Sequence, residues 1–468
     1  MNRYYIKTIV PLLIALLFLI KILMQIMVLA KLGYTNQADF FRNIHHLGIG
    51  FNNICTAFPK VGFCTDYITI KPIIFKKPQD GFSTAQFFIF ISRVFYNIIN
   101  GNNGYFSILY TGVLYAVIYA MGYFSLIRKI NFNNVWTYIL FIATSFIILS
   151  DLVFTSYFNS FFDEPAFIVV ALCFTASFIY YRNATIDILL CLMIILAKHQ
   201  NMIFFLLIPL IYNKYSKPNF KKYHWLIIII GSIFIYYSHL MAVKSFFCLN
   251  SSSSLFSGLL RHEEAPQAAK ILNNFGLPAE FAKYSGFTYF GNSTPTNISK
   301  AILFTQDRGT ICEHVRSGTI IINYLSHPMK MATNLIEYLS DLDKFGPYTD
   351  YSRNTPATNP NLYEKSYFSA IVLTHMRFIV ILLSIISLML IKIYKKQIAS
   401  EPLLILFLGY FGMSILSLMI CIIGDGFADI IRHGLEFYFL ICLAILLVIL
   451  QIPQMINKYI TNFNIGRK

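Results

Sequence analysis

The sequence predicts an all-α polytopic membrane protein, and three observations lead to this fold class. Of the 468 residues, 57% are hydrophobic and only 12% are charged, whereas soluble globular proteins carry roughly 25% charged residues. The mean hydropathy is +0.61. Apolar runs close to the roughly 20 residues that cross a bilayer recur along the chain. This composition excludes nuclear, nucleic-acid-binding and cytosolic enzyme classes.

Ten transmembrane helices are expected, in order along the chain. The first apolar run is longer than the 7–15-residue core of a signal peptide, so we expect a retained span. A hairpin of two shorter halves lies at 184–213, split by the polar tip 198–201, and the amphipathic stretch 83–99 is expected to lie in the interface. The eight long runs are 8–30, 105–127, 135–150, 165–181, 225–242, 369–391, 402–423 and 434–452.

The distribution of charge predicts the orientation. Basic residues such as Arg128, Lys222 and Lys395 gather in the short segments that lie on the same side of the membrane as the N-terminus. The acids in these segments are Asp187 and Glu401. Basic connecting segments stay in the cytoplasm. We therefore expect a multi-pass protein of the inner (plasma) membrane with both termini cytoplasmic. Most of the net charge of +16 then comes from basic residues in the cytoplasmic segments.

This topology divides the chain into three parts. Residues 1–242 form an N-terminal transmembrane module with spans one to seven, which includes a first extracytoplasmic loop at 31–104. Residues 243–368 form an extracytoplasmic loop domain with a helical stretch at 266–275. Residues 369–468 form a C-terminal module with spans eight to ten. The long connecting segments therefore face outward.

The cysteines fit this division. Cys55 and Cys64 share the first outward loop, and Cys248 and Cys312 share the large one, while the other four lie in spans. An even number of cysteines per outward loop is typical of disulfides formed in an oxidising compartment. One disulfide in each loop is expected.

Polar clusters occur where the outward turns begin. If the segment after span one is helical, Asp39 and Arg42 lie at i,i+3 and can pair; the alternative is a solvated juxtamembrane ion pair. Lys198, His199 and Gln200 lie at the tip of the short hairpin. They favour a recessed anion site, and the alternative is an ordinary polar turn.

The turn before the fourth span carries a second acidic cluster. Asp163 and Glu164 precede Pro165, which suits the first turn of a helix, and acids are favourable at that end of a helix. Capping the next span is therefore the alternative reading. Tyr157 and Asn159 are unusual within such an aromatic run, and they favour a binding site.

A third acidic and basic cluster precedes the last span. At 100° per residue, the five side chains fall on one helical face about 100° wide. Such a stripe must face a polar cavity or partners inside the bundle, and the alternative is a buried structural salt-bridge network. The five residues are Asp425, Asp429, Arg432, His433 and Glu436.

Acids and cations around one membrane surface suit transfer of a sugar from a lipid-linked phosphate. A carboxylate can take the proton of the acceptor hydroxyl, which is typically worth 10²–10⁴-fold in rate. Cations can stabilise the departing phosphate. Soluble nucleotide-sugar donors are cytoplasmic, and the sequence carries no Rossmann glycine fingerprint.

The chain resembles the GT-C superfamily of integral-membrane glycosyltransferases, which use polyprenyl-phosphate sugars. The resemblance rests on an acid in the first outward loop, amphipathic juxtamembrane stretches, a large late outward loop and the motifs at 156–165 and 424–433. It implies that Asp39 is the base on the acceptor and that Glu164 or Asp163 is the second-loop acid. Some members need a divalent cation, so Asp39 and Glu164 would hold Mg²⁺ or Mn²⁺ if they converge.

The expected partners are a lipid-linked sugar donor, a cell-envelope glycan or lipid acceptor and membrane lipids, with no nucleic acid. A transporter or flippase of lipid-linked glycans, or a glycan polymerase or ligase, remains an alternative. Lys198, Arg432 and His433 are expected to grip the lipid phosphate. The expected substrate-binding residues are Arg42, Tyr157, Asn159, Lys198, His199, Gln200, Asp425, Asp429, Arg432 and His433.

Overall fold

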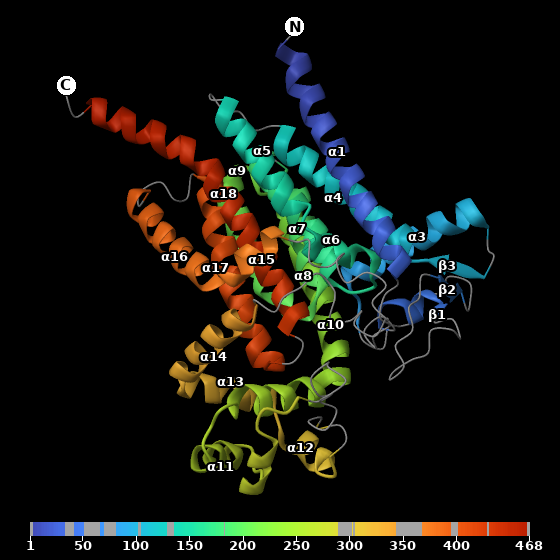
Figure 1. Ribbon diagram of the computed structural model, residues 1–468, viewed down its shortest axis with the longest axis vertical. Coiled ribbons are helices and arrows are strands. Elements are labelled where there is room, and N and C mark those ends of the chain that lie inside the picture. The colour runs from blue at the N-terminus through green and yellow to red at the C-terminus, as the bar shows by residue number, and fades with distance from the viewer. Residues whose placement is uncertain are drawn as a thin grey trace.

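The computed structural model is a helical bundle with a smaller group of helices at one end (Figure 1). The first turn of α1 and the last turn of α18 lie at the same end of the bundle, and α11–α14 lie at the opposite end. The structure describes residues 3–32, 42–50, 66–69, 81–101, 104–128, 135–181, 183–288, 302, 305–342, 367–394, 401–427 and 430–465.

Helices dominate both halves of the chain, with η denoting 3₁₀ helices and, for η4, a π-helix. In order, the first elements are α1 Arg3–Leu32, η1 His45–Leu47, β1 Ile49–Gly50, β2 Asp66–Thr69, α3 Thr84–Asn100, β3 Tyr105–Ser107, α4 Leu109–Arg128, α5 Val135–Leu149, α6 Leu152–Thr155, η2 Ser156–Asn159, α7 Glu164–Tyr180, α8 Ala184–Ala197, η3 His199–Leu206 and α9 Leu207–Asn219. The later elements are α10 Lys222–Ser253, η4 Ser254–Leu259, α11 Ala265–Asn274, η5 Ala279–Tyr284, α12 Arg308–His314, α13 Ser317–Ser326, α14 Pro328–Asp341, α15 Tyr367–Thr374, α16 Met376–Ile393, α17 Pro402–Asp425 and α18 Ile430–Ile465.

The prediction of a helical, multi-pass membrane protein is confirmed. Within the described residues, 6 helices are long and apolar enough to cross a membrane, and up to 7 are if the bent pair α5 and α6–η2 counts as one span. The helices α7 and α8, with 17 and 14 residues, are apolar but shorter. The predicted total of ten spans therefore stays a prediction. The six segments are 8–27, 108–128, 222–241, 376–393, 402–425 and 433–451.

Helix α7 forms the centre of the bundle. Its consecutive side chains from Phe167 to Leu172 are all buried, as expected for a helix that is apolar on every side. It packs between α4 and α8, with α17 and α18 also in contact. Pro165 stands in its first turn, where a missing N–H costs nothing. The helix therefore begins at Glu164, with Asp163 just before it.

A bend between α5 and α6 directs the chain toward α7. The two segments meet at 41°, and the Asp151 carboxylate caps α6 by accepting a bond from Val153 N at 2.9 Å. Two polar side chains of α1 bind at the break: Lys21 Nζ donates to Ser150 Oγ at 2.7 Å, and Gln25 Nε2 donates to Ser150 O at 3.1 Å. These bonds satisfy backbone and hydroxyl groups that a broken helix exposes to an apolar surrounding.

A small antiparallel sheet ties the first loop to the chain after α3. Its strand order is β1-β2-β3, with Ile49 opposite Thr69 and Asp66 opposite Ser107. The predicted amphipathic stretch forms α3, which buries Phe88 and Ile89 and exposes Phe87 and Phe95. The sheet and α3 therefore hold the segment around residues 42–50 against the bundle.

The predicted division into three parts stays a prediction. Helix α10 continues to Ser253, past the boundary expected at 242 and 243, and it packs against η4, α12 and α13. The stretch predicted at 266–275 is confirmed as α11. The disulfide between Cys248 and Cys312 is present, whereas Cys55 and Cys64 lie outside the described residues.

Candidate functional site

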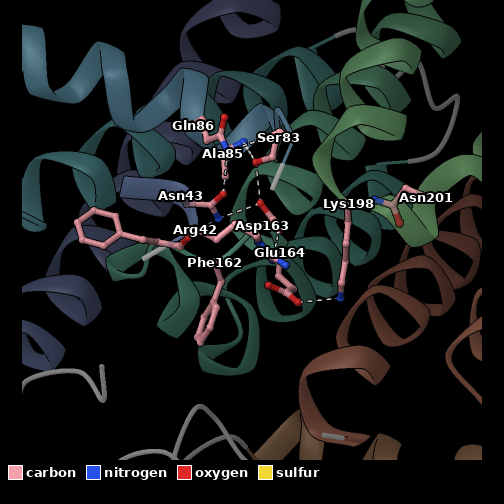
Figure 2. A network of polar contacts seen from close by, with 12 residues as sticks. Arg42, Asn43, Ser83, Ala85, Gln86, Phe162, Asp163, Glu164, Lys198 and Asn201 are labelled. Carbon is pink, nitrogen blue, oxygen red and sulfur yellow. Dashed lines mark hydrogen bonds and ion pairs between the residues drawn. The ribbon is translucent and has the colours of Figure 1, made fainter. Parts of the chain in front are cut away.

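The carboxylate of Asp163 joins three segments that are distant in the sequence (Figure 2). Its Oδ2 accepts a bond from Arg42 Nη2 at 2.8 Å. Its Oδ1 accepts bonds from Asn43 Nδ2 at 3.0 Å and from Ser83 Oγ at 2.6 Å. Asp163 occupies the N-cap position of α7 but makes no side-chain capping bond. It therefore anchors the first loop and the start of α3 rather than capping its own helix.

The two partner segments are fixed by further contacts. Asn43 Nδ2 also donates to Phe161 O at 2.7 Å, and Gln86 Nε2 donates to Asn43 Oδ1 at 3.3 Å. Gly81, with a φ of +84°, lets the chain before α3 approach α10, because a Cβ there would lie 2.4 Å from Ser238 O. Only a glycine adopts this conformation without strain. The first loop, α3 and α10 therefore meet beside Asp163.

Glu164 and Lys198 form a buried ion pair next to this anchor (Figure 2). Lys198 Nζ donates to Glu164 Oε1 at 2.8 Å and lies 4.0 Å from Glu436 Oε1. The exposed fractions of Glu164, Lys198 and Glu436 are 2%, 8% and 1%. One lysine thus lies between two carboxylates, which offsets part of the cost of burying them.

Lys198 and Asn201 lie where α8 ends and the 3₁₀ helix η3 begins. Asn201 Nδ2 donates to Ile194 O at 3.1 Å and to Glu436 Oε1 at 3.5 Å. Its Oδ1 is buried and accepts no hydrogen bond from the described residues. A buried amide oxygen is costly without a donor.

A small crevice lies beside the same turn. It is lined in part by His199 of η3, Phe82 before α3, and Ser238 and His239 of α10. The rings of His199 and His239 lie 5.6 Å apart between centroids. Ser238 Oγ accepts a bond from Phe82 N at 2.7 Å, one residue before Ser83. The crevice therefore adjoins the Asp163 anchor.

The cluster before the last span is arranged differently from the prediction. Asp425 ends α17, and Gly426, with a φ of +60°, breaks the helix before α18 begins at Ile430. The prediction of one continuous helical face through Asp425 is therefore wrong. The two helices nevertheless bring His433 Nε2 to 2.8 Å from Asp425 Oδ2.

Glu436 is separated from that pair and faces Lys198. Cys421 lies between the Asp425–His433 pair and the turn that carries Lys198 and Gln200. Its Sγ is 3.6 Å from His433 O and 3.9 Å from Gln200 Oε1. The described polar side chains thus form one band of contacts from Arg42 to Asp425. The structure brings together residues from all four predicted clusters.

Other predicted site residues lie apart from this band of contacts or outside the residues that the structure describes. Asp39 and Asp429 fall outside the described residues, and Arg432 lies on α18 with a side chain that is not described. Tyr157 and Asn159 are fully buried. Asn159 Nδ2 donates to Ile26 O at 2.8 Å, so this side chain joins η2 to α1. Substrate binding by either stays a prediction.

The sequence did not single out Ser83 and Asn43, and it predicted different neighbours for Glu436. Ser83 has a recognisable signal, because it caps an amphipathic helix by accepting a bond from Ala85 N at 3.1 Å. Glu436 was expected beside Asp425 rather than beside Lys198. Asn43 carries no local signal, since its role comes only from contact with Asp163.

The arrangement supplies carboxylates for proton transfer and a lysine for an anion. Within the described ranges, no group of three or more His, Cys, Asp or Glu side chains could hold a metal ion. The predicted ligand pair for Mg²⁺ or Mn²⁺ includes Asp39, which lies outside those ranges.

Comparison with known proteins gives one family. No curated protein and no solved structure matches the chain. A family model described as the YfdI N-terminal transmembrane domain matches residues 1–466. Since the match covers nearly all of the 468 residues, the protein belongs to the family of the YfdI N-terminal transmembrane domain.

Proposed function

We propose that this protein is a membrane glycosyltransferase of the GT-C type. It transfers a sugar from a polyprenyl-phosphate donor to a cell-envelope glycan or lipid at the extracytoplasmic face. The observation that carries the proposal is the meeting of Asp163, Glu164 and Lys198 with the first-loop residue Arg42 at one end of the bundle. The concentration of basic residues at the other end supports an extracytoplasmic site.

The reaction needs three events at one carbon atom. The acceptor hydroxyl oxygen attacks the anomeric carbon, the bond from that carbon to the phosphate oxygen breaks, and polyprenyl phosphate leaves with the electron pair. The acceptor proton passes to a carboxylate base, which we assign to Asp39 or Glu164. A lipid-linked donor suits this depth, because its tail stays in the bilayer while its phosphate lies near the ends of the spans.

Lys198 is the proposed phosphate ligand. An ammonium group carries three N–H donors, and one of them bonds to Glu164. The remaining donors can bind the leaving phosphate, whose developing charge is most strongly stabilised in a site that excludes water. Further polar groups lie near this lysine, because His199 lines the adjoining crevice and both Gln200 and His433 contact Cys421.

Asp163 has a different proposed role. Its two oxygens accept three hydrogen bonds, from Arg42, Asn43 and Ser83. A carboxylate so occupied is suited to hold the first loop in place, which would position Asp39 on that loop. Glu164, one residue further, turns instead toward Lys198. The two adjacent acids therefore divide into an anchor and a member of the reaction centre.

One feature favours a transporter of lipid-linked glycans as the second candidate. The helix at 184–213 is interrupted at Lys198, and interrupted helices with charged residues are typical of transporter binding sites. A transporter would move the donor lipid between leaflets and return it chemically unchanged. A transferase would produce a new glycosidic bond, so analysis of the product separates the two.

The test is transfer from a radiolabelled polyprenyl-phosphate sugar in proteoliposomes. Glu164→Gln and Asp39→Asn are expected to lower the rate by about 10²-fold or more, if each carboxylate serves in proton transfer. Lys198→Met is expected to lower it by about 10²–10³-fold through lost phosphate stabilisation. Rates are expressed per monodisperse protein, so that misfolded material is not counted.

The chain offers a matched control in a second buried lysine–carboxylate pair. Lys214 Nζ lies 2.9 Å from Asp187 Oδ2, with Asp187 fully buried, and Asp187 stands about 16 Å from Lys198 along α8. Asp187→Asn should leave the rate per folded molecule near that of the wild type. Equal losses in Asp187→Asn and Glu164→Gln, or full transfer by Glu164→Gln and Asp39→Asn together, would refute the assignment.

A further inference from the structure

The helices α13 and α14 form an elbow, residues 317–341, that turns apolar side chains outward. Leu325 and Met329, on either side of the turn at His327, are both 76% exposed. From residue 317 to residue 336 the sequence contains no Asp or Glu. Clustered exposed apolar side chains mark a surface that another phase or partner covers. The exposed members are Ile321, Ile322, Leu325, Met329 and Ile336.

The opposite face of the elbow is fixed against the bundle. Asn334 Nδ2 donates to Gly258 O and to Tyr324 OH, both at 3.1 Å. The rings of Tyr338 and Phe427 lie 5.6 Å apart between centroids. Because these inner side chains bind the end of α17 and η4, the elbow cannot rotate to bury its outer face. The contacts of the inner face therefore keep the apolar side chains of the outer face pointing outward.

The outer face of the elbow continues the surface of a span. Helix α14 packs against α16 and α17, and α13 also contacts α17 (Figure 1). Helix α16 is apolar and long enough to cross the membrane, and it exposes Phe378, Ile381 and Ile385. Exposed apolar side chains on such a helix face lipid. The elbow extends this lipid-facing surface beyond the first turn of α16.

We propose that the elbow inserts its apolar side chains into the bilayer interface, as a second membrane anchor outside the spans. Amphipathic helices that lie in the interface present large apolar residues to lipid and are flanked by basic ones. Arg316, which is exposed just before α13, supplies a basic flank. Lys330 of α14 is instead paired within the protein, where its Nζ lies 2.6 Å from Glu263 Oε1. The proposal does not depend on sugar transfer, and it holds equally for a transporter.

Insertion has a consequence for the candidate site. The elbow contacts Phe427, which follows Asp425 and lies in the turn before α18. An elbow embedded at the depth of lipid phosphates would therefore hold the Asp425–His433 end of the polar band at the same depth. The elbow would then rest on the membrane rather than extend into water.

The test is tryptophan fluorescence of the full protein in nanodiscs. Trp136 and Trp225 are first replaced by phenylalanine, since these are the 2 tryptophans of the chain, and single tryptophans are then placed as L325W or M329W. A matched control is K270W on α11, where Lys270 is exposed. The expected result is a blue-shifted emission from L325W and M329W that brominated phosphatidylcholine quenches, while K270W is quenched only by aqueous iodide.

Two results would overturn the proposal. Iodide quenching of L325W and M329W to the extent seen for K270W, without an effect of brominated lipid, would place the elbow in water. Protection from both quenchers would mean that a second copy or another protein covers the face. I322W provides an independent position if either variant fails to give monodisperse protein, so the outcome stays decisive.

Discussion

Replacing Asp163 tests whether one carboxylate holds the first loop to the bundle. Asp163→Ala removes a buried acceptor from Arg42, Asn43 and Ser83. Arg42 is only 16% exposed and Asp163 only 4%, so little water can replace the lost partner. Breaking a buried ion pair in this way costs about 3–5 kcal/mol. Asp163→Asn keeps the shape and loses the charge, and we expect about 1.5–3 kcal/mol.

The assay is equilibrium unfolding in mixed micelles, with a double-mutant cycle. Arg42→Gln alone leaves the Asp163 carboxylate without its guanidinium donor, and the double variant Arg42→Gln with Asp163→Asn removes both charges. The double variant should be more stable than the sum of the single losses predicts, with a coupling of about 0.5–3 kcal/mol.

Two results would refute this reasoning. One is an Asp163→Ala variant within about 0.5 kcal/mol of the wild type. The other is strict additivity in the cycle, because residues without mutual contact add within about 0.5 kcal/mol. Either would mean that the contacts at Asp163 do not hold the first loop in solution.

Two further predictions concern the region between α10 and α15. Burial raises the pKa of Glu337, but hydrogen bonds from His262 and Arg261 outweigh this effect, so the pKa is lowered from 4.5. The ionised Glu337 therefore stabilises the folded protein above about pH 4.5, and this contribution is lost as the pH falls. Thermal unfolding between about pH 6 and about pH 3 should therefore show a weaker pH dependence in Glu337→Gln, and an unchanged profile would contradict the prediction. The Cys248–Cys312 disulfide closes a loop of 64 residues, so reduction should cost about 4 kcal/mol of unfolding free energy; equal stability with and without reductant would exclude that contribution.

Several parts of the fold could be predicted because their signals are local. Hydrophobic length located the spans at 8–27, 376–393 and 402–425, since a bilayer requires a minimum number of apolar residues. The pattern at 266–275 predicted α11. The pairing of Cys248 with Cys312 was expected because the sequence predicted that both belong to the same loop.

Breaks within apolar runs were harder to predict. The 41° bend after Leu149 is stabilised by Lys21 and Gln25 from α1, and nothing near residue 150 indicates those partners. The break at Gly426 depends on a φ of +60°, which a helical wheel does not detect. A periodicity of charged residues therefore predicted a continuous face where the backbone turns.

The amino-acid sequence by itself determined the membrane class, the positions of the long spans and the polar turns that carry Asp163, Glu164 and Lys198. Only the tertiary structure decided which of these meet. Asp163 and Arg42 are 121 residues apart, and Asn201 and Glu436 are 235 apart. Hydrophobic length and helical period act over a few turns of chain, whereas an ion pair between distant segments depends on how whole helices pack. The polar band is therefore a property of the bundle.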